Sequence, residues 1–308
     1  MVNTCIRELP HGIHLHCRVS GEPGQPLLLF LHGFPEGSFI WEGMLEQFGT
    51  QWRCVAPDLR GFGRSSQPAG VEQYKAKHLL QDLAALIAIE SPGAPAACVI
   101  AHDWGGALAW GLANRHPGLM QRLMILNAPH PGAFLRELLH NPVQQAASQY
   151  MHFLRRPDAP TLLAENDWQR MLGFFRTPQG ELPGWLTPQL QQRYREHWDL
   201  GVQGSCHYYG ASPLVPPRPE DPDSADALRN LRLPPEMLDI FRRILERGDA
   251  DPGFRGLMGF FLLFDHLDSG NEKDPNPAAL RLPSHPYDYP LSFCDRRFDP
   301  NGILYYDQ

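Results

Sequence analysis

Residues 101–106 read Ala-His-Asp-Trp-Gly-Gly, between a short apolar run that ends at Ala101 and a stretch of helical composition. Small residues two before and two after Asp103 allow a tight strand-to-helix turn, which would present the Asp103 side chain at the carboxyl edge of a sheet. The start of the helix would direct its free N–H groups and positive dipole end to the same point. The turn predicts a nucleophile, with aspartate where serine is common. The ordinary alternative for Asp at this place is a helix N-cap.

Strand and helix patterns alternate on both sides of this turn. Continuous apolar runs predict buried strands, alternation predicts an edge strand at 12–19, and helical spacing predicts helices. The buried strands fall at 26–31, 52–56, 96–101 and 123–126, and the helices at 39–48, 74–90 and 107–115. This order predicts an α/β class with a mostly parallel sheet over residues 1–130. Residues 131–235 read as helical and rich in Trp, Tyr, Arg and Gln.

The composition limits the class of function. The chain has 308 residues, 43% of them hydrophobic, and a formal net charge of −7. An acidic chain offers no basic face to a phosphate backbone, so no nucleic-acid partner is expected. No apolar run reaches the roughly 20 residues of a membrane helix, and the first ten residues lack the apolar core of a signal peptide. We therefore expect a cytoplasmic protein without membrane contact. The sequence indicates no oligomeric state.

The sequence gives little support for a metal or a cofactor. None of the six cysteines has CxxC spacing, so free thiols are expected rather than a zinc or redox pair. His14 and His16 flank Leu15 in the alternating stretch, which predicts both imidazoles on one exposed strand face rather than at a metal. No metal and no cofactor are expected.

Four motifs, in this order and spacing, resemble the α/β-hydrolase superfamily and, within it, the epoxide hydrolases. The resemblance extends over residues 1–235 and implies a core domain at 1–130 with a helical cap at 131–235. The motifs are His-Gly-Phe-Pro at 32–35, Asp-Leu-Arg-Gly-Phe-Gly-Arg-Ser at 58–65, Ala-His-Asp-Trp-Gly-Gly at 101–106 and Leu-Asn-Ala-Pro-His-Pro at 126–131.

The resemblance implies a chemistry for the turn. Asp103 would attack an electrophilic carbon of a small apolar epoxide and form an alkyl-enzyme ester, which water can then cleave. The backbone N–H groups of Phe34 and Trp104 would form the oxyanion hole. The family also implies a cis peptide between Phe34 and Pro35.

In this family, tyrosines of the cap donate hydrogen bonds to the epoxide oxygen. Tyr209 lies in a stretch similar to the motif around one of them, although Gly210 stands where the family has Arg. The second position falls at Phe153. Tyr150, one helical turn earlier, would lie on the same helix face and could replace it. Ordinary aromatic packing is the alternative role for both tyrosines.

Two other functions remain open on the sequence. Haloalkane dehalogenases also have Trp after the Asp, so Trp104 could hold a halide released from an alkyl halide, although they have a polar residue where Phe34 stands. Fluoroacetate dehalogenases have Arg directly after the Asp, where this chain has Trp104, so the resemblance does not favour them. The second alternative is a non-catalytic protein that binds a ligand in the same pocket.

The family's catalytic acid and histidine follow the cap, and the sequence departs from the pattern there. In the family, an apolar strand after the cap ends in the catalytic acid. Residues 231–238 resemble the approach to that strand, but residues 239–248 are charged and helix-like. From 253 the chain resembles a cupredoxin fragment of a spore-coat-like multicopper oxidase, which predicts a truncated hydrolase sheet followed by a β-rich tail at 236–308. The catalytic set of nucleophile, acid and histidine would then be incomplete, and the chain would be a fusion product. The rival reading takes Asp265 or Asp268 as acid and His285 as base.

Overall fold

The computed structural model describes residues 1–177, 179–218 and 220–231. Its centre is a six-stranded sheet in the order β1-β2-β4-β3-β5-β6, in which β3 pairs in parallel with β4 and β5, and β5 with β6. The strands are β1 (Asn3–Glu8), β2 (His14–Ser20), β3 (Leu27–Leu31), β4 (Arg53–Pro57), β5 (Cys98–His102) and β6 (Leu123–Leu126). The mostly parallel α/β sheet predicted from the sequence is therefore confirmed in the described part of the chain.

One edge of the sheet differs from the prediction. The strand expected at 12–19 is not an edge strand, because β2 lies between β1 and β4 and pairs antiparallel with both. Gly12, at φ 81°, closes the β1–β2 hairpin, and its N–H donates to the Leu9 carbonyl over 3.0 Å. The prediction missed β1 because its residues are exposed or half-buried and carry no continuous apolar run.

Helices pack on both faces of the sheet. They are α1 (Glu42–Phe48), α2 (Ala76–Glu90) and α3 (Asp103–Arg115), with short 3₁₀ turns η1 (Ser38–Trp41), η2 (Val71–Tyr74) and η3 (Pro117–Leu119). Every residue of β3 and β4 is buried, as expected for central strands covered on both faces. The four apolar positions predicted for α2 are all buried: Leu79, Leu83, Leu86 and Ile87. Each such side chain contributes roughly 1.5–3 kcal/mol of transfer free energy.

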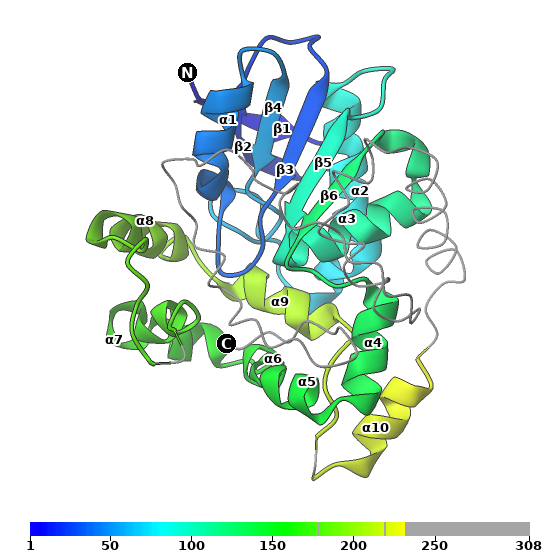
Figure 1. Ribbon diagram of the computed structural model, residues 1–308, viewed down its shortest axis with the longest axis vertical. Helices are drawn as coiled ribbons and strands as arrows, with labels where there is room; N and C mark the ends of the chain where they lie inside the picture. Colours follow the sequence, from blue (N-terminus) through cyan, green and yellow to red (C-terminus); the bar gives the residue numbers. More distant parts are fainter. Residues whose placement is uncertain (178, 219, 232–308) are drawn as a thin grey trace, which may run out of the picture.

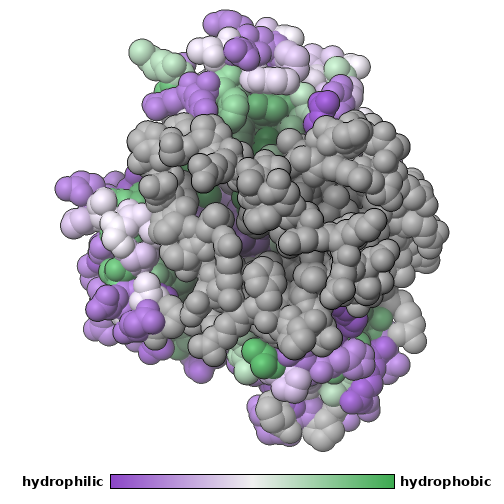
Figure 2. All heavy atoms as spheres, in the orientation of Figure 1, coloured by the Kyte–Doolittle hydropathy of each residue, from purple (hydrophilic) through white to green (hydrophobic). Residues whose placement is uncertain are grey.

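A second group of helices follows β6 in the chain, and we call it the helical segment 131–229. In Figure 1 it fills the half of the molecule below the sheet, and α9 is its helix nearest to the strands. Its helices are α4 (Pro131–His140), α5 (Pro142–Ala147), α6 (Tyr150–Leu154), α7 (Ala159–Gly173), α8 (Pro188–Trp198), α9 (Gln203–Ala211) and α10 (Pro222–Arg229). Figure 2 shows mostly hydrophilic residues on its visible described surface, at the left and lower edges.

Side-chain contacts fix this segment to the sheet. The Tyr208 hydroxyl of α9 donates to the Arg60 carbonyl over 2.8 Å, and Arg60 itself forms a buried bidentate pair with Asp82 of α2, at 2.6 and 2.7 Å. The Gln67 amide donates to the Leu200 carbonyl over 3.2 Å. These bonds hold α9 over the carboxyl ends of the parallel strands, where open α/β sheets place their sites.

The predicted β-rich tail at 236–308, with Asp265, Asp268 and His285, lies outside the described residues, and so does the predicted truncation of the sheet. Among the described residues, no helix combines the length and apolar content needed to cross a membrane.

Candidate active site

Asp103 occupies a strained turn between β5 and α3. Its φ is +49°, a left-handed value that costs a non-glycine residue free energy, although Asp tolerates it better than most. Gly105 makes the turn possible, because a Cβ there would lie 2.6 Å from the His32 carbonyl oxygen. The N-cap residue of α3 is His102, whose side chain makes no capping hydrogen bond. The Asp103 side chain instead contacts the loop after β3. The turn predicted from residues 101–106 is therefore present.

Two backbone N–H groups bind the Asp103 carboxyl. The Phe34 N–H donates to Oδ1 over 2.7 Å, and the Trp104 N–H donates to the same carboxyl group. Burial raises the pKa of Asp103, while the His102 charge and these two N–H groups oppose the rise. Phe34 and Trp104 are the two residues that the sequence placed in an oxyanion hole, and the structure brings both to Asp103.

The loop after β3 approaches the Asp103 side chain closely. A Cβ at Gly33 would overlap Oδ1, Cβ and Cγ of Asp103, so only glycine fits there. The Phe34–Pro35 peptide is cis, as predicted. His32 anchors the start of the loop, because its Nε2 accepts from the Leu59 N–H over 3.0 Å and its Nδ1 lies 2.9 Å from the Gly33 carbonyl oxygen. Burial lowers the pKa of His32, which fits this neutral tautomer.

A histidine–glutamate pair lies beside the turn. His102 Nδ1 is 2.8 Å from Glu36 Oε2. Burial disfavours the imidazolium, but the Glu36 carboxylate outweighs it and raises the pKa of His102 to about 9. For Glu36, burial opposes ionisation, but the His102 charge lowers its pKa below the ordinary value. The Glu36 carboxylate therefore favours the protonated form of His102, directly beside Asp103.

Glu36→Gln should lower the pKa of His102 toward its ordinary 6.5. A histidine whose pKa is raised by folding stabilises the fold fully below its unfolded pKa and loses that contribution as pH rises through its folded pKa. The unfolding free energy lost in Glu36→Gln should thus be largest near pH 6 and shrink as the pH rises through about 9. NMR titration of His102, with urea unfolding at both pH values, measures this. Glu72→Gln, which removes an exposed pair with Lys75, is the control; an unchanged His102 titration in Glu36→Gln would contradict the pairing.

Aromatic rings surround the carboxyl group. Tyr209 of α9 is 2% exposed, and its ring lies edge-to-face with Phe34 at 5.4 Å and with Trp104 at 5.2 Å between centroids. The Tyr150 ring of α6 lies 6.0 Å from that of Tyr209. Burial, then the charges of Tyr150 and Asp103, raise the pKa of Tyr209 well above its ordinary value, so its hydroxyl is protonated at neutral pH.

The structure distinguishes the two aromatic residues considered on α6. Tyr150 faces Tyr209 and Phe174, whereas the Phe153 ring contacts the Arg170 guanidinium at 5.7 Å from its centroid. Phe174, just after α7, also packs on Phe34 at 5.3 Å. The sequence prediction did not include Phe174, because only the fold brings it to the loop.

Glu36 and His102 were missed for a different reason. Both lie within two residues of a predicted site residue: Glu36 is two residues after Phe34, and His102 directly precedes Asp103. A titratable residue this close to a predicted site position was a usable signal.

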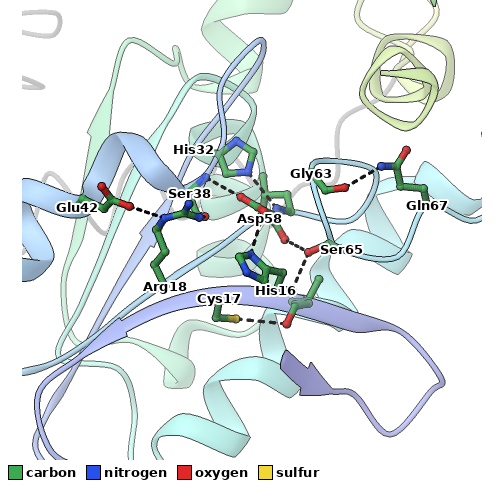
Figure 3. A network of polar contacts seen from close by, with 12 residues as sticks. His16, Cys17, Arg18, His32, Ser38, Glu42, Asp58, Gly63, Ser65 and Gln67 are labelled. Carbon is green, nitrogen blue, oxygen red and sulfur yellow. Dashed lines mark hydrogen bonds and ion pairs between the residues drawn. The ribbon is translucent and has the colours of Figure 1, made fainter. Parts of the chain in front are cut away.

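A polar network around Asp58 links β2 to the residues that follow the loop after β3 (Figure 3). Asp58 Oδ1 accepts from the Ser38 N–H over 2.8 Å, and Oδ2 lies 3.2 Å from His16 Nδ1. Burial opposes ionisation of Asp58, but the bond to His16 and nearby histidine charges lower its pKa far below the ordinary value. Asp58 therefore stays ionised and holds the start of η1 to β2.

The histidines of β2 are not on an exposed face, contrary to the sequence prediction. His14 Nδ1 lies 2.9 Å from the Ser66 hydroxyl, and His16 contacts Asp58, so both are half-buried structural groups. Within the described residues, no group of three His, Cys, Asp or Glu side chains could hold a metal ion. Cys5, Cys17, Cys54, Cys98 and Cys206 are free thiols.

The chain is similar to known proteins in both sequence and fold. The family described as "alpha/beta hydrolase fold" matches residues 26–213. Epoxide hydrolase 3 of Xenopus tropicalis is 43% identical over 158 residues, 51% of this chain and 42% of that protein. A point mutant of an epoxide hydrolase from Bacillus megaterium superposes with a TM-score of 0.65 at 30% identity, covering 75% of this chain and 77% of that one.

Another mutant of the Bacillus megaterium enzyme was solved with its product, a naphthyloxy-propane-diol. It superposes with a TM-score of 0.64 at 29% identity, over 73% of this chain and 75% of that one. The chain spans about half the length of the curated relatives that it matches.

Proposed function

Because this chain belongs to the alpha/beta hydrolase fold family and is epoxide hydrolase-like, we propose that it opens epoxides with Asp103 as nucleophile. The observation that carries the proposal is the Asp103 carboxyl group, held on the strained turn by the Phe34 and Trp104 N–H groups beneath Tyr209. We also propose that the helical segment 131–229 acts as the cap over this carboxyl group.

In the first step, Asp103 Oδ2 attacks an epoxide carbon, and the ring C–O bond breaks. The electron pair of that bond moves to the epoxide oxygen, which takes a proton from the hydroxyl of Tyr209 or Tyr150. The product is a hydroxyalkyl ester of Asp103. The Phe34 N–H fixes Oδ1, which leaves Oδ2 to react and makes Oδ1 the ester carbonyl oxygen.

In the second step, water would attack the ester carbonyl carbon, and negative charge would develop on Oδ1. The Phe34 N–H, which binds Oδ1, would stabilise that charge, and the Trp104 N–H contacts the same carboxyl group. The step also needs a base to take the proton of the water. Among the described residues, the imidazole whose charge acts most strongly on Asp103 is that of His102, which Glu36 keeps protonated. We therefore propose that this 308-residue chain releases its ester slowly.

The surroundings of Trp104 favour an epoxide over an alkyl halide. The Trp104 side chain interacts with the Tyr209 hydroxyl. This contact favours a role for Trp104 in orienting that hydroxyl over a role in binding a halide. Phe34 and Phe174 add apolar aromatic walls, which suit an aryl epoxide. The product bound to the Bacillus megaterium relative is itself an aryl ether diol.

Mixing the chain with a styrene-oxide-type substrate tests this function. We expect one equivalent of covalent adduct per chain, formed faster than diol is released, because His102, the imidazole that adjoins Asp103 among the described residues, is held in its protonated form by Glu36. Intact mass spectrometry measures the adduct, and chromatography measures the diol. Rapid steady-state diol formation would contradict the slow release and would indicate a base outside the described residues, of which His285 is the predicted candidate. If neither adduct nor diol forms, the result would favour the ligand-binding alternative.

A further inference from the structure

Two neighbouring side chains of α8 hold the loop that carries the Phe34 N–H. The indole Nε1–H of Trp198 donates to the Pro35 carbonyl over 2.7 Å, in a fully buried bond. The ring of the preceding residue, His197, lies against the same loop, because a Cβ at Gly37 would come within 2.4 Å of it. The helical segment 131–229 thus contacts the loop at Pro35 and at Gly37.

The donor at Trp198 is itself held rigidly. Its side chain is 1% exposed, and its ring stacks on Phe175 at 6.4 Å with 17° between the planes. The rings of Tyr194 and Trp168 lie 5.4 Å and 5.8 Å from it. An indole packed on several sides cannot follow the loop if the loop shifts, so it fixes the Pro35 carbonyl in place.

The same loop meets Asp103 on its other side. The Phe34 N–H, adjacent to the Phe34–Pro35 peptide, donates to Asp103 Oδ1 over 2.7 Å. We infer that Trp198 is a positioning residue, which sets the Phe34 N–H against the Asp103 carboxyl through the Pro35 carbonyl. This inference rests on the proposed role of Asp103, and it makes the seating of α8 part of the catalytic geometry.

Trp198→Phe keeps an aromatic ring and removes the indole N–H. The buried Pro35 carbonyl then lacks its donor, a situation that costs about 1–3 kcal/mol if nothing moves, so the loop relaxes. A longer Phe34 N–H bond stabilises the Asp103 carboxylate less, and the pKa of Asp103 rises. The other groups that face this carboxyl are His102, Glu36 and Tyr209, all unchanged in the variant.

The test is the pH profile of adduct formation by an aryl epoxide, measured by intact mass in single turnover. In Trp198→Phe, the midpoint should move to higher pH by about half a unit to one unit, and the rate at saturating epoxide should fall about tenfold. Trp168→Phe is the matched control. It removes an indole bond to Asp199 Oδ1, 2.8 Å long, from the same aromatic cluster but not from the loop. Its midpoint should equal that of the wild type.

A second readout follows the Phe34 amide directly, by hydrogen exchange in ¹⁵N-labelled protein, and needs no reaction. Faster exchange in Trp198→Phe than in Trp168→Phe supports the inference even if the wild type forms no adduct, a result that would refute only the proposed function. Equal exchange and equal midpoints in the two variants would overturn the inference and leave Trp198 a packing residue. If Trp198→Phe does not fold, 3-benzothienylalanine at position 198 keeps the bicyclic ring without the N–H.

Discussion

Asp103→Asn should form adduct with an aryl epoxide at least roughly a thousandfold more slowly than the wild type, because a neutral amide is a far weaker nucleophile than a carboxylate. Asn tolerates a left-handed backbone as well as Asp does, so the φ of +49° at this position does not penalise the variant. The turn should therefore form, and the melting temperature should stay close to that of the wild type. Intact mass spectrometry over a time course measures the rate, and a thermal melt checks the fold.

Asp199→Asn is the matched control for this variant. Asp199 is an exposed carboxylate of the helical segment that accepts the Trp168 indole bond, away from the loop, so the adduct should form at the wild-type rate. An adduct in Asp103→Asn as fast as in the wild type would show that another side chain is alkylated.

Gly33→Ala should lower the rate of adduct formation by about a hundredfold. The added Cβ would overlap the Asp103 side chain, so either the loop or the carboxyl group must shift. A displacement near 1 Å at a reacting group typically costs about that factor in rate. The Phe34 N–H follows Gly33 directly, so the same shift weakens its bond to Oδ1. Single-turnover kinetics at saturating epoxide measure the effect.

Gly118→Ala is the control for this substitution. A Cβ at Gly118 meets nothing within 4 Å, and its φ needs no glycine, so the variant should react like the wild type. If Gly33→Ala kept the wild-type rate, the close approach of the loop to Asp103 would not matter for the reaction.

The sequence predicted the centre of the fold well, for a local reason. Strands such as β3 and β4 are buried on both faces, and their continuous apolar runs are legible without tertiary information. The turn at Asp103 was equally legible, because the small residues Ala101 and Gly105 flank it. β1 could not be predicted in this way, because its exposed and half-buried residues form a strand only by pairing with β2.

The parts of the site that were missed depend on long-range contacts. Glu36 and His102 are 66 residues apart, and neither position alone indicates that the two side chains pair and shift each other's pKa. The bond from Trp198 to the Pro35 carbonyl joins residues 163 apart and involves a backbone acceptor, for which the sequence has no signature. Tyr150 was proposed from helical spacing, and its contact with Tyr209 needed the packing of α6 against α9.

The protonation of His102 links this geometry to the fate of the ester. The Glu36 carboxylate raises the pKa of His102 to about 9, which favours the protonated imidazole at neutral pH, and the His102 charge stabilises the Asp103 carboxylate. A protonated imidazole does not take a proton from water. We therefore propose that the described part of the site forms an ester more readily than it hydrolyses one.

The central claim is that Asp103 is the nucleophile, and the site of covalent modification tests it most directly. The wild-type chain is incubated with an aryl epoxide at pH 7, digested, and sequenced by tandem mass spectrometry. We predict a single modification, with the mass of one epoxide, on the carboxyl group of Asp103. A modification on any other residue, such as His102 or a cysteine, with Asp103 unmodified and no diol formed, would contradict the account.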